Sequence, residues 1–139
     1  VFNAGIQGCI ATTQNTDGAP VEIHNCNTED TSLQEWTATF AIRGSTSPSP
    51  ITISGNKCLD VTGGVNAVGT KLQIWTCSGG PNQKWVNNLD GTFQWSGTDK
   101  CIDLTDGKLT DGTQLQLWTC DTNNNNQKWG AAPNPDFGA

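Results

Sequence analysis

Two aspartates and two tryptophans recur at matching positions in this chain of 139 residues. Asp60 comes two residues after a cysteine, and Trp75 comes two residues before the next cysteine. Asp103 and Trp118 repeat this spacing. A carboxylate accepts hydroxyl hydrogens in charge-assisted bonds, and the face of an indole packs against the C–H groups on one face of a pyranose ring. The residue types and their spacing therefore suit a sugar ligand.

A structural role is the alternative for these four residues. The two aspartates would then cap turns, and the two tryptophans would be partly buried in the core. A single set would leave this alternative as strong as binding. Two parallel sets favour a binding role, because turn capping alone does not require an indole beside each carboxylate.

Three copies of the motif Gln-x-Trp divide the chain at near-equal intervals. Their tryptophans, Trp36, Trp85 and Trp129, lie 49 and 44 residues apart. A glycine stands eight residues before the second cysteine of each copy, at positions 18, 69 and 112. A period of this size is typical of repeat architectures. We therefore predict three equivalent units that share one core.

The six cysteines follow the same repeat. An even number with regular spacing favours disulfides and a secreted protein. Each unit holds its own pair, so the predicted bonds are Cys9–Cys26, Cys58–Cys77 and Cys101–Cys120. Each would close a loop of about 17–20 residues, worth roughly 3 kcal/mol. Buried reduced thiols are the alternative, and no Asn-x-Ser/Thr sequon adds support for secretion.

Short runs of alternating apolar and polar residues predict an all-β fold. They are clearest at 72–75 and 115–118, and Asp-Gly pairs at 90–91, 106–107 and 111–112 supply turns. No long stretch has the apolar period of a helix. Three β-rich units cannot each bury a face, so they share a core about a pseudo-threefold axis. The β-trefoil is the compact solution, whereas a three-bladed propeller would be unusually small.

The chain length predicts one domain over residues 1–139, with repeats at about 5–43, 51–92 and 93–132. The extra residues between the first two repeats, near 44–50, are expected to form a surface connection and not an interdomain linker. The tail, 131–139, is expected to be a terminal strand edge or the start of a linker. Val1 is not a start Met and no signal peptide is visible, so we expect a mature form or an excised domain.

Strand alternation assigns faces to the candidate residues. Leu72 and Ile74 are predicted to point to the core, and Trp75 to point outward. The equivalent residues of the third repeat follow the same rule. If each disulfide joins directly opposed strands, Asp60 lies opposite Trp75 and Asp103 opposite Trp118. The Gln-x-Trp residues occur in all three repeats, so we assign them mainly to the core and its internal hydrogen bonds.

Composition excludes several classes of function. The chain carries 13 Asp+Glu against 7 Lys+Arg, which argues against nucleic acid and anionic membrane surfaces as partners. No apolar run approaches the roughly 18 residues of a membrane span. His24 is the only histidine and no C-x-x-C motif occurs, so we expect neither a zinc site nor another cofactor. Nor does a Ser/His/Asp arrangement stand out.

The combined pattern is similar to the ricin B-type lectins, also called family 13 carbohydrate-binding modules. The resemblance rests on Cys-x-Asp, Gln-x-Trp-x-Cys and Asn-Gln-x-Trp, repeated over roughly residues 5–129. It implies a β-trefoil that binds galactose-type sugars, such as galactose, N-acetylgalactosamine or lactose, or xylan in some members. It also implies that Asp60 and Asp103 bind two sugar hydroxyls each and that Trp75 and Trp118 stack on the sugar. The amides that would complete the hydrogen bonds are Gln73, Gln116, Asn82 and Asn126.

Gln83 and Gln127, from the Gln-x-Trp motifs, are counted with the candidate site residues, although their main expected role is internal. The loops at 63–68 and 106–110 are expected to decide which sugar binds. The first repeat departs from the pattern: the residues at the Asp, Gln, Trp and Asn positions are Ala11, Glu22, His24 and Leu33. Without the carboxylate we expect the first site to be absent or much weaker.

Three readings of function remain open at this point. The first is a lectin with two shallow sites and no catalysis, because paired carboxylates of a glycosidase lie about 5–9.5 Å apart and Asp60 and Asp103 belong to different lobes. The second is the xylan- or galactan-targeting module of a larger secreted glycosidase. The third is a trefoil used for protein contacts, which explains the core but not the Asp/Trp pairs.

Overall fold

The protein is an all-β molecule built from three sets of four strands, as the computed structural model shows for residues 2–3, 8–26, 32–38 and 47–131. The first set is β1 (Phe2–Asn3), β2 (Gly8–Thr12), β3 (Val21–Asn25) and β4 (Trp36–Ala38). The second set is β5 (Ile51–Ile53), β6 (Lys57–Val61), β7 (Leu72–Thr76) and β8 (Trp85–Asn87). The third set is β9 (Phe93–Trp95), β10 (Lys100–Leu104), β11 (Thr113–Thr119) and β12 (Gly130–Ala131).

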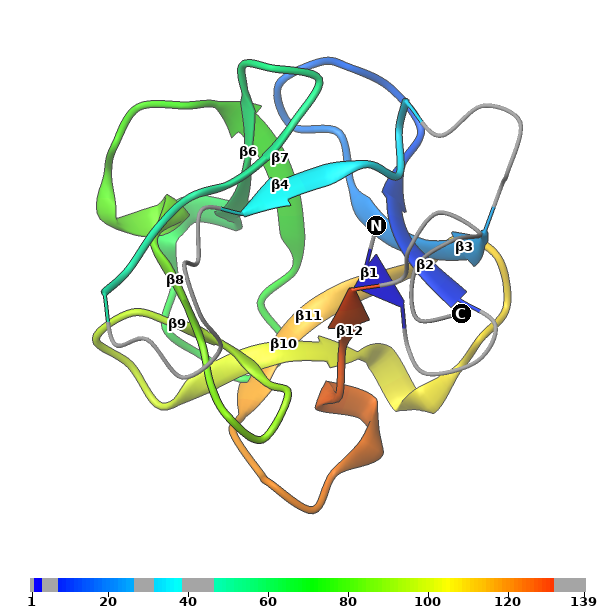
Figure 1. Cartoon of the computed structure of the whole chain (residues 1–139), viewed down its shortest axis with the longest axis vertical. Helices are drawn as coiled ribbons and strands as arrows, with labels where there is room; N and C mark the ends of the chain where they lie inside the picture. Colours follow the sequence, from blue (N-terminus) through cyan, green and yellow to red (C-terminus); the bar gives the residue numbers. More distant parts are fainter. Residues whose placement is uncertain (1, 4–7, 27–31, 39–46, 132–139) are drawn as a thin grey trace.

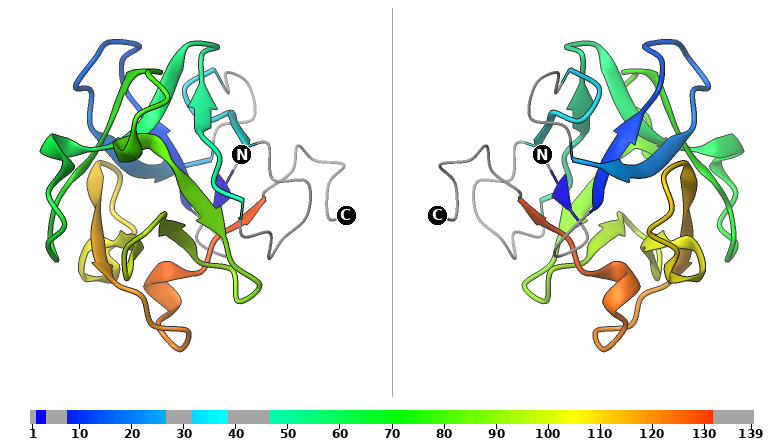
Figure 2. Two further views of the ribbon diagram at one scale, coloured as in Figure 1. Left: turned by 90° about the vertical axis from the view of Figure 1, so that its left-hand side faces the viewer. Right: turned by 90° about the vertical axis from the view of Figure 1, so that its right-hand side faces the viewer.

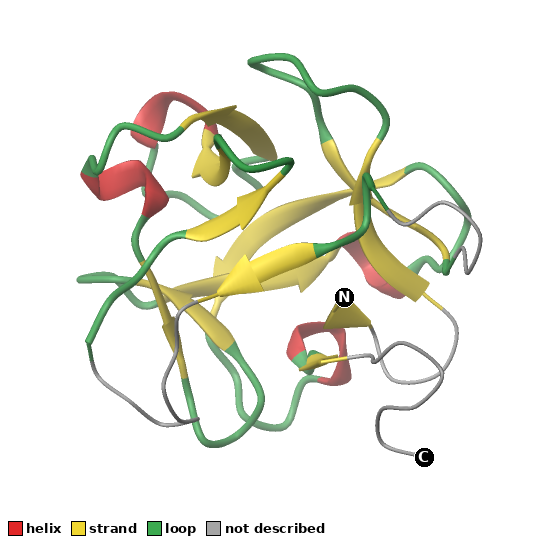
Figure 3. Cartoon of the chain, turned by 45° about the horizontal axis from the view of Figure 1, so that its top comes forward, coloured by secondary structure: helices red, strands yellow, loops and turns green. Residues whose placement is uncertain are grey.

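Four short 3-10 turns accompany these strands. They are η1 (Thr62–Gly64), η2 (Pro81–Gln83), η3 (Thr105–Gly107) and η4 (Asn125–Gln127). Figure 3 shows these turns beside the strand ends and not within the strands. No helix of the described residues is both long and apolar enough to cross a bilayer.

The strand pairing closes the three sets into a ring. The fourth strand of each set pairs antiparallel with the first strand of the next, as β4 with β5, β8 with β9, and β12 with β1. The two middle strands of each set form a hairpin, as β2 with β3, β6 with β7, and β10 with β11. The three lobes surround a common axis in Figure 1, and the side views in Figure 2 show β12 beside β1. This is the predicted β-trefoil.

The glycines of the repeat join neighbouring lobes. The backbone N–H groups of Gly18, Gly69 and Gly112 donate to the carbonyls of Ile74, Leu117 and Ile23, at 2.8, 2.8 and 2.9 Å. Each glycine has a φ between 88° and 93°, where residues with a Cβ are strained. The regular spacing of these glycines therefore has a structural cause: each crosses to the next hairpin in a conformation that suits glycine.

The core is shared by all three repeats, and the motif tryptophans lie within it. Trp36, Trp85 and Trp129 are buried. Their indole N–H groups donate to backbone carbonyls on the second strand of their own repeats, at Ile10, Leu59 and Ile102. Because a buried indole N–H needs a partner, these bonds fix each tryptophan against its own hairpin. The prediction that the Gln-x-Trp tryptophans are core residues is confirmed.

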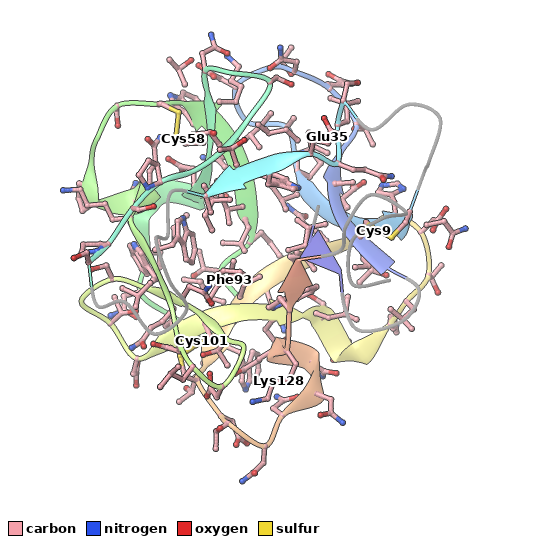
Figure 4. All side chains as sticks on the ribbon, viewed as in Figure 1. Cys9, Glu35, Cys58, Phe93, Cys101 and Lys128 are labelled. Carbon is pink, nitrogen blue, oxygen red and sulfur yellow. A yellow bond between two sulfur atoms is a disulfide. The ribbon has the colours of Figure 1, made fainter. Side chains whose placement is uncertain are left out.

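Three disulfides join the predicted pairs, Cys9–Cys26, Cys58–Cys77 and Cys101–Cys120, and the described residues contain no free cysteine. Each bond stays within one lobe, and Figure 4 labels one cysteine of each pair in the three lobes. Their Cα–Cα distances of 5.0 to 5.1 Å lie within the usual range for disulfides. Each lobe is therefore held by its own covalent link.

The predicted strand register is wrong by two residues. Asp60 pairs with Gln73, and Trp75 lies opposite Cys58. The third repeat has the same offset, with Asp103 opposite Gln116 and Trp118 opposite a cysteine. The reason is that the second cysteine of each pair follows the end of its strand: the N–H of Cys77 donates to the carbonyl of Asn56. The disulfide therefore runs diagonally between the strands.

Parts of two predicted segments lie outside the described residues. These are 44–46 of the connection between the first two repeats and 132–139 of the tail. Within the described part of the connection, Pro48 and Pro50 are exposed, whereas Ser49 is buried and exchanges both backbone hydrogen bonds with Trp85. This segment therefore pairs with the start of β8 and leads directly into strand β5.

Candidate functional site

The hairpin β6–β7 places a carboxylate and an indole on its outward face in the second repeat. Leu72 and Ile74 point inward and are fully buried, whereas the alternate residue Trp75 is 44% exposed. Asp60 lies on the same face as Trp75, because paired residues share a face and Asp60 is paired with Gln73. The predicted faces are thus confirmed, although Asp60 and Trp75 are diagonal neighbours and not opposite partners.

Hairpin β10–β11 repeats this arrangement in the third lobe. Leu115 and Leu117 are fully buried, and Trp118 is 43% exposed. Asp103 shares the outward face through its pairing with Gln116. The second and third lobes therefore carry the same set of outward-facing side chains: an aspartate, the glutamine opposite it and a half-exposed tryptophan. We call this set the constellation.

Each carboxylate is held by two glutamine side chains. In the second repeat, Gln73 Nε2 donates to Asp60 Oδ1 at 2.9 Å, and Gln83 Nε2 donates to Asp60 Oδ2 at 3.0 Å. In the third repeat, Gln116 and Gln127 bind the two oxygens of Asp103 at 3.0 and 3.1 Å. The orientation of each carboxylate is therefore set before any ligand arrives.

These bonds leave acceptor capacity on both carboxylate oxygens. An ionised carboxylate has about four acceptor positions, and the glutamines occupy two of them. Asp60 is only 6% exposed and Asp103 only 3%, and each aspartate lines the hollow of its repeat. Each carboxylate thus keeps acceptor positions at the wall of a hollow that also contains an exposed indole.

Gln83 and Gln127 have no free amide hydrogen for a ligand. The Nε2 of Gln83 also donates to the carbonyl of Thr76, and its Oε1 accepts from the N–H of Ser78. Gln127 makes the equivalent bonds with Thr119 and Asp121. Both side chains are buried. They therefore position the carboxylates from behind, as their expected internal role requires.

Two hollows of different size surround the constellations. The hollow of the second repeat has a volume of about 690 Å³, and that of the third repeat about 120 Å³. The first is lined by Asp60, Thr62, Gly63, Gln73, Trp75, Ser78, Gly80, Pro81, Asn82 and Gln83. The second is lined by Asp103, Asp106, Gln116, Trp118, Asn124 and Asn126. The structure therefore brings nine of the ten candidate residues to the hollow walls, and Gln127 lies behind the wall.

The two asparagines reach their hollows because the opposing turns carry glycine. A Cβ at Gly64 would lie 2.8 Å from Oδ1 of Asn82, and a Cβ at Gly107 would lie 3.0 Å from Oδ1 of Asn126. Turn η1 packs on η2 and turn η3 packs on η4 in the same way. The close approach of backbone and amide forms one wall of each site.

The carboxylate of the third site has a perturbed pKa. Burial raises the pKa of Asp103 above its ordinary value, and the charge of Asp106 adds to the rise. Hydrogen bonds from Gln116 and Gln127 and the charge of Lys71 act in the opposite direction. Because the ionised form is the better hydroxyl acceptor, the ligand capacity of this site depends on pH.

Within its described residues, the first repeat lacks the carboxylate and also the 3-10 turn that forms one wall of the other two sites. Ala11 is buried at the aspartate position, and His24 Nε2 lies 2.8 Å from Glu22 Oε1. The segment from Ala11 to Gly18 is two residues shorter than its counterparts, and no 3-10 turn follows β2. A hollow of about 340 Å³ is present, and Ala11, His24, Leu33 and Gln34 line it at the equivalent positions. The carboxylate on its wall belongs to Asp111 of the third repeat.

Sequence reasoning missed the residues of the walls that come from the 3-10 turns. Asp106 was expected only as part of a loop, yet it lines the third hollow, and Gly63 occupies the same place in the second. Both have positive φ, 54° and 68°. The signal was present in the sequence, because both residues follow the site aspartate by three positions.

Comparison with known proteins identifies the family and the fold. The family model for the ricin-type beta-trefoil lectin domain matches residues 1–129. None of the curated protein sequences matches the chain. The designed threefold-symmetric protein ThreeFoil is similar in structure, with a TM-score of 0.75 and 24% identity over 92% of this chain and 93% of its own.

Two natural proteins share the fold over part of their length. The Polyporus squamosus lectin has a TM-score of 0.69 and 21% identity over 93% of this chain and 46% of its own. A non-toxic homologue of type II RIPs from Momordica charantia has a TM-score of 0.65 and 20% identity over 88% of this chain and 43% of its own. The chain thus spans less than half of either natural protein. With the family model covering nearly all of its length, the chain belongs to the ricin-type β-trefoil lectin domain family, whose members bind carbohydrate.

Proposed function

We propose that this protein is a lectin that binds galactose-type glycans through two shallow sites. The sites are formed by the second and third repeats, and the first repeat is degenerate. The observation that carries the proposal is the paired constellation: a carboxylate oriented by two glutamine amides beside a half-exposed indole occurs in both lobes. The galactose class comes from the family resemblance and is supported by similar structures.

Two of those structures were solved with galactose-containing ligands. The Momordica charantia protein was in complex with α-methyl-D-galactoside, and the Polyporus squamosus lectin was bound to a glycan in which galactose links sialic acid to N-acetylglucosamine. A galactose-type residue offers adjacent hydroxyls for the carboxylate and an apolar C–H face for the indole. We expect galactose, N-acetylgalactosamine and lactose to bind, with xylose-type sugars as the alternative class.

The contacts within each site suggest a role for each residue. Asp60 and Asp103 accept two sugar hydroxyls each, and Trp75 and Trp118 stack on the ring. The amides of Gln73 and Gln116 orient the carboxylates and adjoin the ligand. Asn82 and Asn126 complete the hydrogen bonds from the opposing walls. No residue needs to transfer a proton, so the function is binding and not catalysis.

A glycan array tests this proposal. The wild-type protein should bind galactose-terminated glycans, and the double variant Asp60→Ala/Asp103→Ala should lose that signal while keeping its circular dichroism spectrum. The fold should survive because Ala11 already occupies this position in the first repeat, where Gln34 still donates to the carbonyl of Asn25 at 3.0 Å. An unchanged array signal in the folded double variant would reject the site assignment.

The sugar-targeting module of a larger secreted enzyme is the second candidate. It is favoured by the similar structure of GalNAc-T7, an enzyme chain of which this domain covers only 21%. Sequencing the complete gene decides between a separate lectin and a module. We also propose an extracellular location, because the disulfides of the three lobes persist best in an oxidising environment. Fractionation of the producing cells and their medium tests it.

A further inference from the structure

The two sites differ in charge at positions that are equivalent in the repeat. The middle residue of turn η1 is Gly63, and the middle residue of turn η3 is Asp106. Both residues line their hollows. The residue after the second cysteine is Ser78 in the second repeat and Asp121 in the third. The third site therefore has two more carboxylates at or beside its wall than the second.

Asp106 is exposed, and its side chain lies at the wall of the hollow in which a ligand would sit. Its side chain shares one hollow of about 120 Å³ with Asp103 and Trp118. It has a φ of 54°, a left-handed conformation that aspartate tolerates better than most residues and that glycine adopts without strain at the equivalent position. The carboxylate therefore projects from turn η3 at the wall of this hollow.

Two lysines lie near the third site, and the charge of Lys71 partly offsets the negative charge of Asp103. Lys71 reaches across from the second repeat, and its Nζ lies 3.5 Å from Gln116 Oε1 and 3.5 Å from Thr105 Oγ1. It does not line the hollow. Lys108 is exposed and lies beyond the turn. The side chains that line the hollow therefore carry two negative charges in the third site and one in the second.

From this difference we infer that the two sites select different glycans: the third site prefers neutral sugars, and the second also accepts anionic ones such as sulfated or sialylated galactose. This inference rests on the proposed function and assigns the selectivity of the third site to Asp106, with Asp121 in support. The larger hollow of the second site, walled by Ser78, Gly80 and Pro81, has room for the additional group. Asp106 is thus a specificity-determining residue.

Single-site chains allow the test. Asp103→Ala leaves only the second site, and Asp60→Ala leaves only the third. Each is titrated by calorimetry with methyl galactoside, its 6-O-methyl derivative, and its 3- and 6-sulfates. The 6-O-methyl sugar is the neutral control for size. We expect Asp103→Ala to bind neutral and sulfated sugars within about threefold, and Asp60→Ala to bind the sulfates about tenfold more weakly or worse.

Charge and size are separated by a matched variant. In the Asp60→Ala background, Asp106→Asn with Asp121→Asn keeps the shape of the wall and removes its charge, so binding of the sulfates should recover most of the loss. Adding 1 M NaCl should also narrow the gap, because it shortens the Debye length to about 3 Å.

The outcomes distinguish this inference from the proposed function. Equal binding of neutral and sulfated sugars by Asp60→Ala would overturn the selectivity, and so would a preference that Asp106→Asn with Asp121→Asn leaves unchanged. Failure of the wild-type chain to bind any of these sugars would instead overturn the proposed function, and the inference with it.

Discussion

Trp75 and Trp85 lie ten residues apart in the same repeat and occupy opposite environments. Trp75 is 44% exposed beside the carboxylate of Asp60, whereas Trp85 is fully buried and its indole N–H donates to Leu59. The same side chain therefore serves a ligand in one place and the core in the other. Strand alternation explains the exposure of Trp75, because Leu72 and Ile74 of the same strand point to the core and Trp75 lies on the opposite face.

The two tryptophans predict opposite effects of alanine substitution. Trp75→Ala should weaken galactoside binding at the second site by about fivefold or more and change the free energy of unfolding by no more than about 0.5 kcal/mol. Trp85→Ala should lower the free energy of unfolding by about 3–5 kcal/mol, because it leaves a large cavity. Urea denaturation and calorimetric titration measure both effects. A strongly destabilised Trp75→Ala would show that this indole is a core residue after all.

The carboxylate of Asp103 predicts a pH dependence of the third site. Its pKa is raised by burial and by the charge of Asp106. A sugar hydroxyl prefers the ionised form, so binding is fullest above this raised pKa and falls as pH decreases through it. In the Asp60→Ala chain, galactoside affinity should therefore decline from a pH above the ordinary range of an aspartate. Titrations between pH 7 and pH 4 check this, and affinity that is constant down to pH 4 would contradict it.

At the scale of elements, each hairpin meets the next at a contact that we call a seam, where Gly18, Gly69 or Gly112 donates its backbone hydrogen bond to the neighbouring lobe. The three seams are similar but not identical. The residue before the seam glycine is Asp17 in the first repeat, and its Oδ1 accepts from the N–H of Thr76 at 2.7 Å and lies 3.0 Å from Nζ of Lys57. Asp111 occupies this position in the third repeat and accepts from the N–H of Asn25. Val68 occupies it in the second repeat and is half-exposed. The seam between the second and third lobes thus lacks a carboxylate.

This difference predicts a stabilising substitution. Val68→Asp should place a carboxylate near the N–H of Thr119, which is equivalent to the Thr76 N–H that Asp17 accepts from. The nearby amine of Lys100 already pairs with Asp99 at 2.6 Å, so the backbone hydrogen bond is the expected gain. One added hydrogen bond corresponds to a rise in Tm of about 2–4 °C. Asp17→Val is the matched control and should lower Tm. Scanning calorimetry measures both, and a lower Tm for Val68→Asp would show that the seams are not equivalent.

The repeat also explains which features of the hairpins could be predicted from the sequence. The period of cysteine, glycine and tryptophan sets the number of hairpins, and alternation sets the faces of Leu72, Ile74 and Trp75. Register depends on where a strand ends, and Cys77 lies one residue beyond its strand, so the inferred pairing of Asp60 with Trp75 was wrong by two residues. The hydrogen bonds of Gln83 to Asp60 connect different elements, and their geometry has no local sequence signal.

At the scale of the whole molecule, the three lobes share one pseudo-threefold fold but differ in whether they carry a site. All three repeats keep the disulfide, the seam glycine and the buried tryptophan, which the ring of strands requires. Only two keep the carboxylate, and within the described parts of the repeats only those two have the 3-10 turns that wall the site. Loss of the site from the first repeat leaves the fold intact, because Ala11 and Gln34 preserve the packing behind it.

Two sites on different lobes also predict that one molecule can bind two glycans of a glycan-bearing surface at once. Shallow single sites bind weakly, and two sites on one rigid chain can raise avidity toward clustered glycans by about 10²–10⁴ when the spacing fits. Asp60→Ala and Asp103→Ala should each keep binding to free galactoside and lose most haemagglutination. Agglutination titres of the two variants measure this. Full agglutination by either variant would indicate that sites on separate chains act together.

The stoichiometry of galactoside binding tests the central claim most directly. Calorimetric titration of the wild-type chain should find two sites per molecule, and Asp60→Ala and Asp103→Ala should each retain one. The double variant should remain folded and bind none. Undiminished binding of galactoside by the folded double variant would contradict the assignment of the sites to Asp60 with Trp75 and Asp103 with Trp118.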